Sequence, residues 1–200
     1  LRAYVLLAPH LKGLGQHNSA WCTDVHGHRL FHASRDGNHM AFGAAPHFAR
    51  RSVGYVGFSD GWQDLADNFR FDWQFDQAED GNIALTGEID LSQGMEFVVA
   101  IAFGRSLQSA STKLLQSLSV PFEQHRLTYV KQWKRTVPAS DNGLSDCTSD
   151  GGHIGRLSRM ILLAHEDKTY PGAMIASLSI AWGDEKTDDE LGGYHLLWTR

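Results

Sequence analysis

The chain has 200 residues and a mass of 22.2 kDa, enough for one large or two small domains of ~100–200 residues each with a buried core. Lys and Arg total 18 against 23 Asp and Glu, which gives a net charge of −5, and the basic residues do not cluster beyond neighbouring pairs. This excludes a nucleic-acid-binding surface, because phosphate binding requires a concentrated basic face. The longest uncharged apolar run, residues 173–183, is far shorter than the ~20 residues of a membrane helix. Residues 1–11 have the pattern of a strand interior and not of a signal peptide.

Most of the first hundred residues form short apolar or alternating segments separated by turn signals. Strands are predicted over residues 3–7, 29–33, 40–45, 52–58, 69–76, 83–91 and 96–103. The pattern is clearest in residues 69–76, where aromatic residues at every second position alternate strictly with polar ones. Seven or so antiparallel strands within residues 1–105 predict a β-sandwich.

After Arg105 the pattern changes from strands to helices. Apolar residues at helical spacing predict a helix over residues 106–118 and a second one that begins at Pro121 and ends at Pro138. Residues 140–152, rich in Asp, Ser and Gly, are predicted to be a linker. A third helix follows, with apolar residues at 154, 157, 161 and 162 on one face and further apolar neighbours beside them. We expect this helix to be buried on most of its sides.

Five histidines between residues 26 and 47 resemble a metal site at first sight. His26 and His28, however, flank Gly27 in a predicted turn, so that their side chains follow different strands and do not converge as metal ligands must. We therefore predict surface or half-buried imidazoles and no metal at these positions. Cys22 and Cys147 allow one disulfide by number but exclude a disulfide scaffold.

Other motifs carry little chemistry by themselves. Five carboxylates crowd into residues 184–190, but closely spaced loop carboxylates more often form a solvated face or a cation site than a catalytic pair. The glycines at 13, 15, 151 and 152 do not lie in a strand-to-helix unit with the spacing of a phosphate loop. The chain also contains no G-x-S-x-G sequence, which excludes a nucleophile elbow of that type.

The segment from Gly192 to Arg200 combines residue types that suit a sugar. Two glycines allow close approach of the backbone, Tyr194 and Trp198 offer aromatic faces for stacking, and Arg200 offers forked donors for neighbouring hydroxyls. A buried loop in which Trp198 fills space explains the same residues equally well. Residue chemistry alone leaves both interpretations open.

Longer motifs carry a family resemblance. Residues 165–177 (HEDKTYPGAMIAS) and 192–200 (GGYHLLWTR) resemble the start of the catalytic domain of bacterial glucoamylases and glucodextranases, glycoside hydrolase family 15. Residues 4–11 (YVLLAPHL) and 54–65 (GYVGFSDGWQDL) resemble the N-terminal β-sandwich that precedes this domain. The resemblance thus extends over nearly the whole chain.

The resemblance implies a large antiparallel β-sandwich, similar to a supersandwich, followed by a helical linker and an (α/α)6 barrel. Its expected boundaries are residues 1–105 for the sandwich, 106–152 for the linker and 153–200 for the start of the barrel. It also implies an exo-acting, inverting hydrolase that removes glucose from the non-reducing ends of α-glucans. In the family, positions matching Tyr194, Trp198 and Arg200 line the subsite for the terminal glucose.

The same resemblance implies that this chain is part of a larger enzyme. About 140 residues of helix are needed for twelve barrel helices, whereas 48 residues follow Gly152. We therefore expect the catalytic glutamates to lie beyond Arg200, the sandwich to begin mid-domain, and the chain to be inactive alone. A non-catalytic sandwich that binds carbohydrate or supports a partner domain is the alternative.

Several properties stay open at this stage. No cofactor is expected to be required, and the hard oxygen ligands of residues 184–190 are compatible with calcium. The partner is expected to be an α-glucan, with no nucleic acid and no membrane. The sequence leaves open the linkage (α-1,4, α-1,6 or the bond of trehalose), the oligomeric state, and a secreted or cytoplasmic location.

Overall fold

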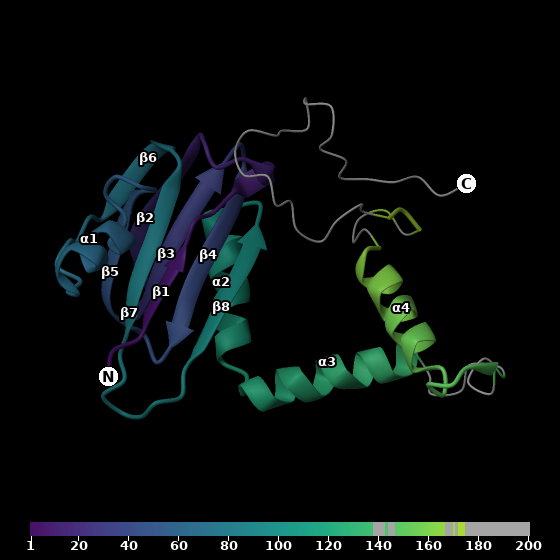
Figure 1. Ribbon diagram of the computed structural model, residues 1–200. Coiled ribbons are helices and arrows are strands. Elements are labelled where there is room, and N and C mark those ends of the chain that lie inside the picture. Colours follow the sequence, from purple (N-terminus) through teal and green to yellow (C-terminus); the bar gives the residue numbers. More distant parts are fainter. Residues whose placement is uncertain (138–142, 144–146, 167–169, 171, 175–200) are drawn as a thin grey trace. The chain divides into compact units, whose positions relative to one another are not determined.

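The computed structural model describes residues 1–137, 143, 147–166, 170 and 172–174 (Figure 1). The chain divides into two units, Leu1–Phe122 and Glu123–Arg200. The first unit holds all the strands of the described residues, and the second holds most of α3 and all of α4.

Eight strands of the described residues form two antiparallel sheets. The smaller sheet has the order β1-β7-β5, and the larger sheet has the order β6-β2-β3-β4-β8. The strand bounds are β1 Tyr4–Leu7, β2 Asn18–Val25, β3 His28–Arg35, β4 Asn38–Ala45, β5 Phe48–Tyr55, β6 Gln77–Gly81, β7 Ile83–Ile89 and β8 Val98–Gly104. The predicted antiparallel sandwich is thereby confirmed.

Two tight turns join the central strands of the larger sheet. Between β2 and β3, His26 and Gly27 both have positive φ (50° and 81°), and between β3 and β4 the same is true of Asp36 and Gly37 (46° and 74°). Two consecutive residues with positive φ are typical of the turn whose twist matches that of a hairpin. These turns send His26 and His28 to different positions on the hairpin, as the sequence predicts.

The core between the two sheets is built around three phenylalanine rings. Phe31 of β3, Phe42 of β4 and Phe48 of β5 are at most 1% exposed, and their ring centroids lie 5.1–5.7 Å apart. Rings at this distance add attraction to the burial of apolar area. This cluster fixes how the two sheets lie on each other.

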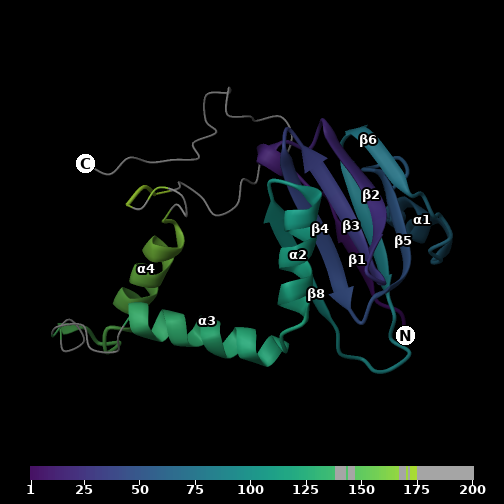
Figure 2. The same ribbon diagram turned by 180° about the vertical axis from the view of Figure 1, so that it is seen from behind.

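Helix α2 (Leu107–Leu118) covers the outer face of the larger sheet over β4 and β8 (Figure 2). Its first turn is capped by Ser106, whose Oγ accepts a hydrogen bond from the N–H of Ser109 at 3.1 Å. Ala110 and Leu114 are fully buried against Leu30 and Ala41 of the sheet. The helix therefore forms a second, smaller core on the far side of the larger sheet.

One histidine is buried under this helix, so the prediction of a surface or half-buried imidazole is wrong for His32. His32 of β3 is 1% exposed, its Nε2 lies 3.4 Å from Ser111 Oγ of α2, and its Nδ1 has no hydrogen-bond partner. The Trp21 ring lies edge-on to the imidazole, with centroids 5.8 Å apart. Burial, together with the nearby His39, lowers the pKa of His32 from 6.5 to about 4. The imidazole is therefore neutral at neutral pH.

The strand predicted over residues 69–76 is wrong. Helix α1 (Gly61–Asn68) precedes this segment, and residues 70–76 form no regular strand. A side chain takes the place of a strand partner for part of this segment: the Asp64 carboxylate accepts hydrogen bonds from the backbone N–H groups of Asp72 (2.7 Å) and Trp73 (2.8 Å). Of the four alternating aromatic residues only Phe71 is buried, whereas Phe69, Trp73 and Phe75 are exposed.

The helices after the sandwich lie where the sequence predicts them, but their burial differs. Helix α3 spans Phe122–Thr136 and helix α4 spans His153–Ala164. None of the described α4 residues is buried, and Ile154, Leu157 and Ile161 are 68%, 44% and 58% exposed. The expectation of a helix buried on most sides is therefore wrong for this chain, because no described segment packs around its apolar face.

Candidate functional site

The three predicted sugar-binding residues, Tyr194, Trp198 and Arg200, lie outside the described residues. So do the acidic residues 184–190, in which the sequence allows a calcium ion. The structure therefore describes the elements that lead to this region. In the second unit these are the loop after α4 and the two helices α3 and α4, which have a groove between them.

The loop after α4 begins the motif that resembles a catalytic domain. Glu166 and Met174 form an antiparallel bridge, and the Glu166 carboxylate accepts a hydrogen bond from the N–H of Gly172 at 3.0 Å. Ala173 is 6% exposed, and its N–H donates to the carbonyl of Tyr170 at 3.0 Å. The Glu166 side chain thus closes the loop, so that it serves a structural purpose within the described residues.

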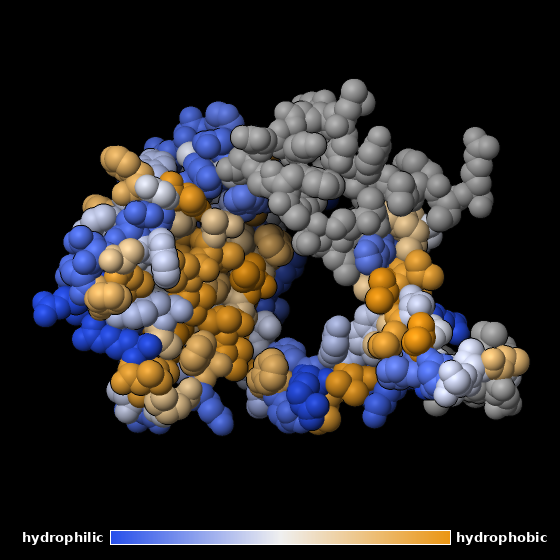
Figure 3. All heavy atoms as spheres, viewed as in Figure 1, coloured by the Kyte–Doolittle hydropathy of each residue, from blue (hydrophilic) through white to orange (hydrophobic). Residues whose placement is uncertain are grey.

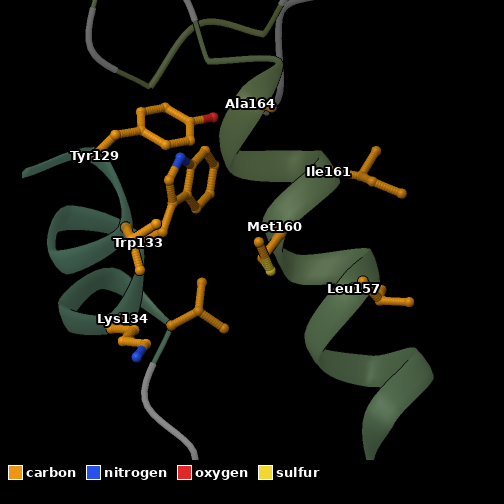
Figure 4. Close-up of a pocket in the computed structure, with 9 residues that line it drawn as sticks. Tyr129, Trp133, Lys134, Leu157, Met160, Ile161 and Ala164 are labelled. Atoms are coloured by element: carbon orange, nitrogen blue, oxygen red, sulfur yellow. The ribbon is translucent and has the colours of Figure 1, made fainter. Parts of the chain in front are cut away.

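A groove of about 530 Å³ lies between α3 and α4. In Figure 4 the Trp133 ring of α3 and the Met160 side chain of α4 extend into the space between the two helices. The Tyr129 ring packs edge-on against Trp133, with centroids 6.1 Å apart. Val130, Val137 and Ala164 are among the other residues that line the groove.

The chemistry of this groove is that of a packing surface. Tyr129 and Lys134 are the titratable residues among its lining side chains, and no carboxylate is present. Glycoside hydrolysis requires a pair of carboxyl groups, so the groove cannot perform it. Its aromatic and aliphatic walls instead suit an apolar protein segment.

The motif at residues 54–65 forms a rigid turn in the first unit. The Asp60 carboxylate caps α1 by accepting hydrogen bonds from the N–H groups of Trp62 (2.9 Å) and Gln63 (3.0 Å), and it also accepts one from Gly57. The N–H of Gly61 donates to Thr86 Oγ1 of β7 at 3.2 Å. A Cβ at Gly61 would lie 2.4 Å from the Thr86 side chain, so only glycine fits here. The motif therefore anchors α1 to the smaller sheet.

This rigid turn presents an aromatic side chain to solvent. Trp62 is 63% exposed and lines a shallow hollow of about 420 Å³ together with Leu6, Val56 and Gln63. The nearby carboxylate of Asp60 is already occupied by backbone donors. Few polar groups are thus free to bind sugar hydroxyls at this hollow.

The remaining chemical groups of the described residues form no reactive centre. Cys22 and Cys147 are both free, and burial raises the pKa of the Cys22 thiol to about 11, which makes it inert at neutral pH. No three His, Cys, Asp or Glu side chains of the described ranges converge as a metal site. No helix within them is long and apolar enough to cross a membrane.

Comparison with known proteins agrees with this architecture. The fold defines an antiparallel β-sandwich module with a helical extension. The family described as "Glucodextranase, domain N" matches residues 1–136, and the chain belongs to this family. The predicted relationship to the bacterial glucoamylases and glucodextranases is therefore confirmed.

Two individual proteins are similar over nearly the whole chain. A glucoamylase of Clostridium sp. (strain G0005) is 33% identical over 199 residues, which cover all of this chain and 28% of that protein. A bacterial glucoamylase solved in complex with acarbose has 34% identity and a TM-score of 0.87. The match covers 98% of this chain and 28% of that structure. The chain thus spans a little over a quarter of the length of these relatives.

Proposed function

We propose that residues 1–200 are part of an exo-acting, inverting α-glucoside hydrolase that releases glucose from the non-reducing ends of α-glucans. The observation that carries this proposal is the similarity of the chain to a glucoamylase solved with acarbose, at 34% identity and a TM-score of 0.87. The family match over residues 1–136 supports the same assignment for the sandwich.

In this proposal the chain is built of three parts: the sandwich over residues 1–105, a helical linker over 106–152, and the start of a helical barrel over 153–200. The change from strand to helix between Gly104 and Leu107 supports the first boundary, while α2 itself packs on the larger sheet within the unit Leu1–Phe122. The open apolar groove between α3 and α4 supports the third part, because further helices would cover it.

Tyr194, Trp198 and Arg200 would bind the terminal glucose. The aromatic rings would stack on the sugar, and the guanidinium would donate hydrogen bonds to its hydroxyls. An inverting mechanism requires two carboxyl groups ~6.5–9.5 Å apart with a water molecule between them. We assign this pair to glutamates outside residues 1–200, so the chain by itself is expected to be inactive.

The assay follows the anomer that a longer protein, continuing past Arg200, releases from maltooligosaccharides and isomaltooligosaccharides. Initial formation of β-glucose supports the proposal, and α-glucose contradicts inversion. Arg200→Ala should lower kcat/KM more than tenfold, which corresponds to at least about 1.4 kcal/mol of transition-state binding. Arg2→Ala, which removes a guanidinium from the surface of the sandwich, is the matched control and should leave kcat/KM unchanged. Equal rates for both variants would remove the subsite assignment.

A further inference from the structure

The segment after α1 has the most regular pattern in the sequence, although it forms no strand. Over residues 69–76 an aromatic residue alternates with a charged or amide residue, in the order FRFDWQFD. Phe71 is fully buried, and packing of the first unit accounts for its ring. The other three rings are partly or almost wholly uncovered, with exposed fractions of 87% for Phe69, 37% for Trp73 and 44% for Phe75. Packing therefore leaves most of this aromatic pattern unexplained.

Phe69 has a backbone conformation that is unfavourable for its side chain. It follows the last residue of α1 with φ 59° and ψ 24°, in the left-handed region where glycine is the usual residue at a helix end. A bulky aromatic residue is rare there, because its Cβ crowds the following carbonyl group. The exposed ring also gains little from burial. A residue that is both strained and uncovered indicates that its ring contacts something outside the sandwich.

The backbone holds the other two exposed rings in place. The carbonyl of Phe75 accepts a hydrogen bond from the N–H of Val53 in β5 at 2.9 Å, and the carbonyl of Asp76 accepts one from the N–H of Cys22 in β2 at 2.7 Å. The segment is thus fixed to both sheets. The Trp73 and Phe75 rings lie beside each other, with centroids 6.2 Å apart and an angle of 51° between their planes. Rings that are already positioned lose little conformational entropy when a ligand binds.

The polar side chains between these rings are available for hydrogen bonds. Arg70 and Gln74 are exposed, and neither side chain has a partner among the described residues. The carboxylate of Asp72 accepts a single long hydrogen bond, from Asn68 Nδ2 at 3.5 Å. A guanidinium offers several donors, an amide offers donors and an acceptor, and a carboxylate offers acceptors. This set matches the hydroxyl groups of a sugar, each of which both donates and accepts.

We propose that residues 69–76 form a binding surface for an α-glucan chain on the sandwich. The C–H faces of successive glucose units stack on the exposed aromatic rings, and their hydroxyl groups form hydrogen bonds with the interleaved polar side chains. The angle between the Trp73 and Phe75 rings suits a bent chain, whose successive units are inclined to each other. This inference deepens the proposed function and rests on it for the identity of the ligand.

The composition of the segment favours a sugar over a protein segment as its ligand. Residues 69–76 include four aromatic residues and no aliphatic one, whereas Val, Leu, Ile and Met side chains line the groove between α3 and α4. Figure 3 shows mostly hydrophilic side chains around α1, at the left, whereas hydrophobic side chains gather over β4 and β8. Protein interfaces need a contiguous apolar patch, which rings separated by polar residues do not provide.

Native electrophoresis of the 200-residue chain in gels that contain soluble starch or dextran tests the proposal. At least one of these polysaccharides should retard the chain, and Trp73→Ala should weaken the binding by at least about tenfold. Trp62→Ala, which removes a 63% exposed tryptophan from the first turn of α1, is the matched control and should bind as the wild type. Unchanged mobility in both gels, or equal binding by the two variants, would overturn the proposal.

A second variant separates binding from folding. Phe69→Gly relieves the left-handed conformation, so it should leave the stability in urea unchanged or higher while weakening polysaccharide binding by about threefold or more. Unchanged binding by this variant would show that the ring contacts no glucan and would contradict the proposal. Release of glucose from maltotriose is measured on the longer protein. Binding through Trp73 without hydrolysis contradicts the proposed function alone, whereas hydrolysis without such binding contradicts the glucan surface alone.

Discussion

The buried imidazole of His32 should make the stability of the sandwich depend on pH. The side chain is 1% exposed under α2, and burial lowers its pKa from 6.5 to about 4. Between these two values the unfolded chain binds a proton that the folded chain does not, so the free energy of unfolding falls as the pH falls. For these pKa values the loss between pH 7 and pH 5 is about 2 kcal/mol.

The measurement is urea unfolding of the wild type and His32→Gln at pH 7 and pH 5. Gln keeps a polar side chain beside Ser111 but does not titrate, so this variant should lose about 2 kcal/mol less than the wild type. His28→Gln, at an exposed position of the same strand, should behave as the wild type. Equal losses for the wild type and His32→Gln, or an NMR titration midpoint of His32 near 6.5, would refute the reasoning.

Two further substitutions test the packing of the first unit, both measured as the free energy of unfolding in urea. Leu114→Ala should cost about 2–5 kcal/mol, because the side chain is fully buried between α2 and the larger sheet; a cost below about 1 kcal/mol would contradict that packing. Gly61→Ala should lower the free energy of unfolding by about 1–3 kcal/mol, because the added Cβ would lie 2.4 Å from the Thr86 side chain. Gly155→Ala in α4, whose Cβ would meet no atom within 4 Å, is the control and should not destabilise.

The sandwich could be predicted because its strands obey simple local rules. Turns at Gly27 and Gly37 and the apolar residues of β3, β4 and β8 identify most of the larger sheet. Strand β2 was not predicted, since Asn18–Val25 mixes polar and apolar residues on both of its faces. Its burial comes from partners on either side, β3 and β6, which only the folded sheet brings together.

The failure at residues 69–76 has a specific physical cause. Alternation predicts that every second side chain faces the core, but here this holds only for Phe71, because alternation does not report what pairs with the backbone. Here a helix supplies the partner, because Asp64 of α1 binds two N–H groups of the segment. The Ser59-Asp60-Gly61 sequence contains the signal for that helix, since Asp60 is a favoured capping residue.

The candidate sugar-binding residues could be proposed from the sequence only through a family resemblance. Tyr194, Trp198 and Arg200 are residue types that suit both a sugar subsite and a buried loop. Discrimination requires the other side chains of the site, and these come from segments remote in sequence. The same reasoning applies to α4, whose apolar face predicts burial but cannot say which segment provides it.

The order of strands in the smaller sheet has a consequence for synthesis on the ribosome. Its central strand is β7, and Tyr4 pairs with Glu88, a residue 84 positions later. The hairpins of β2, β3 and β4, in contrast, pair neighbours in sequence and can form as soon as they emerge. Strands β1 and β5 must therefore wait, unpaired, until Ile83–Ile89 has left the exit tunnel. During that interval the smaller sheet does not yet cover the inner face of the larger sheet, and transiently exposed apolar surface of this kind is prone to aggregation.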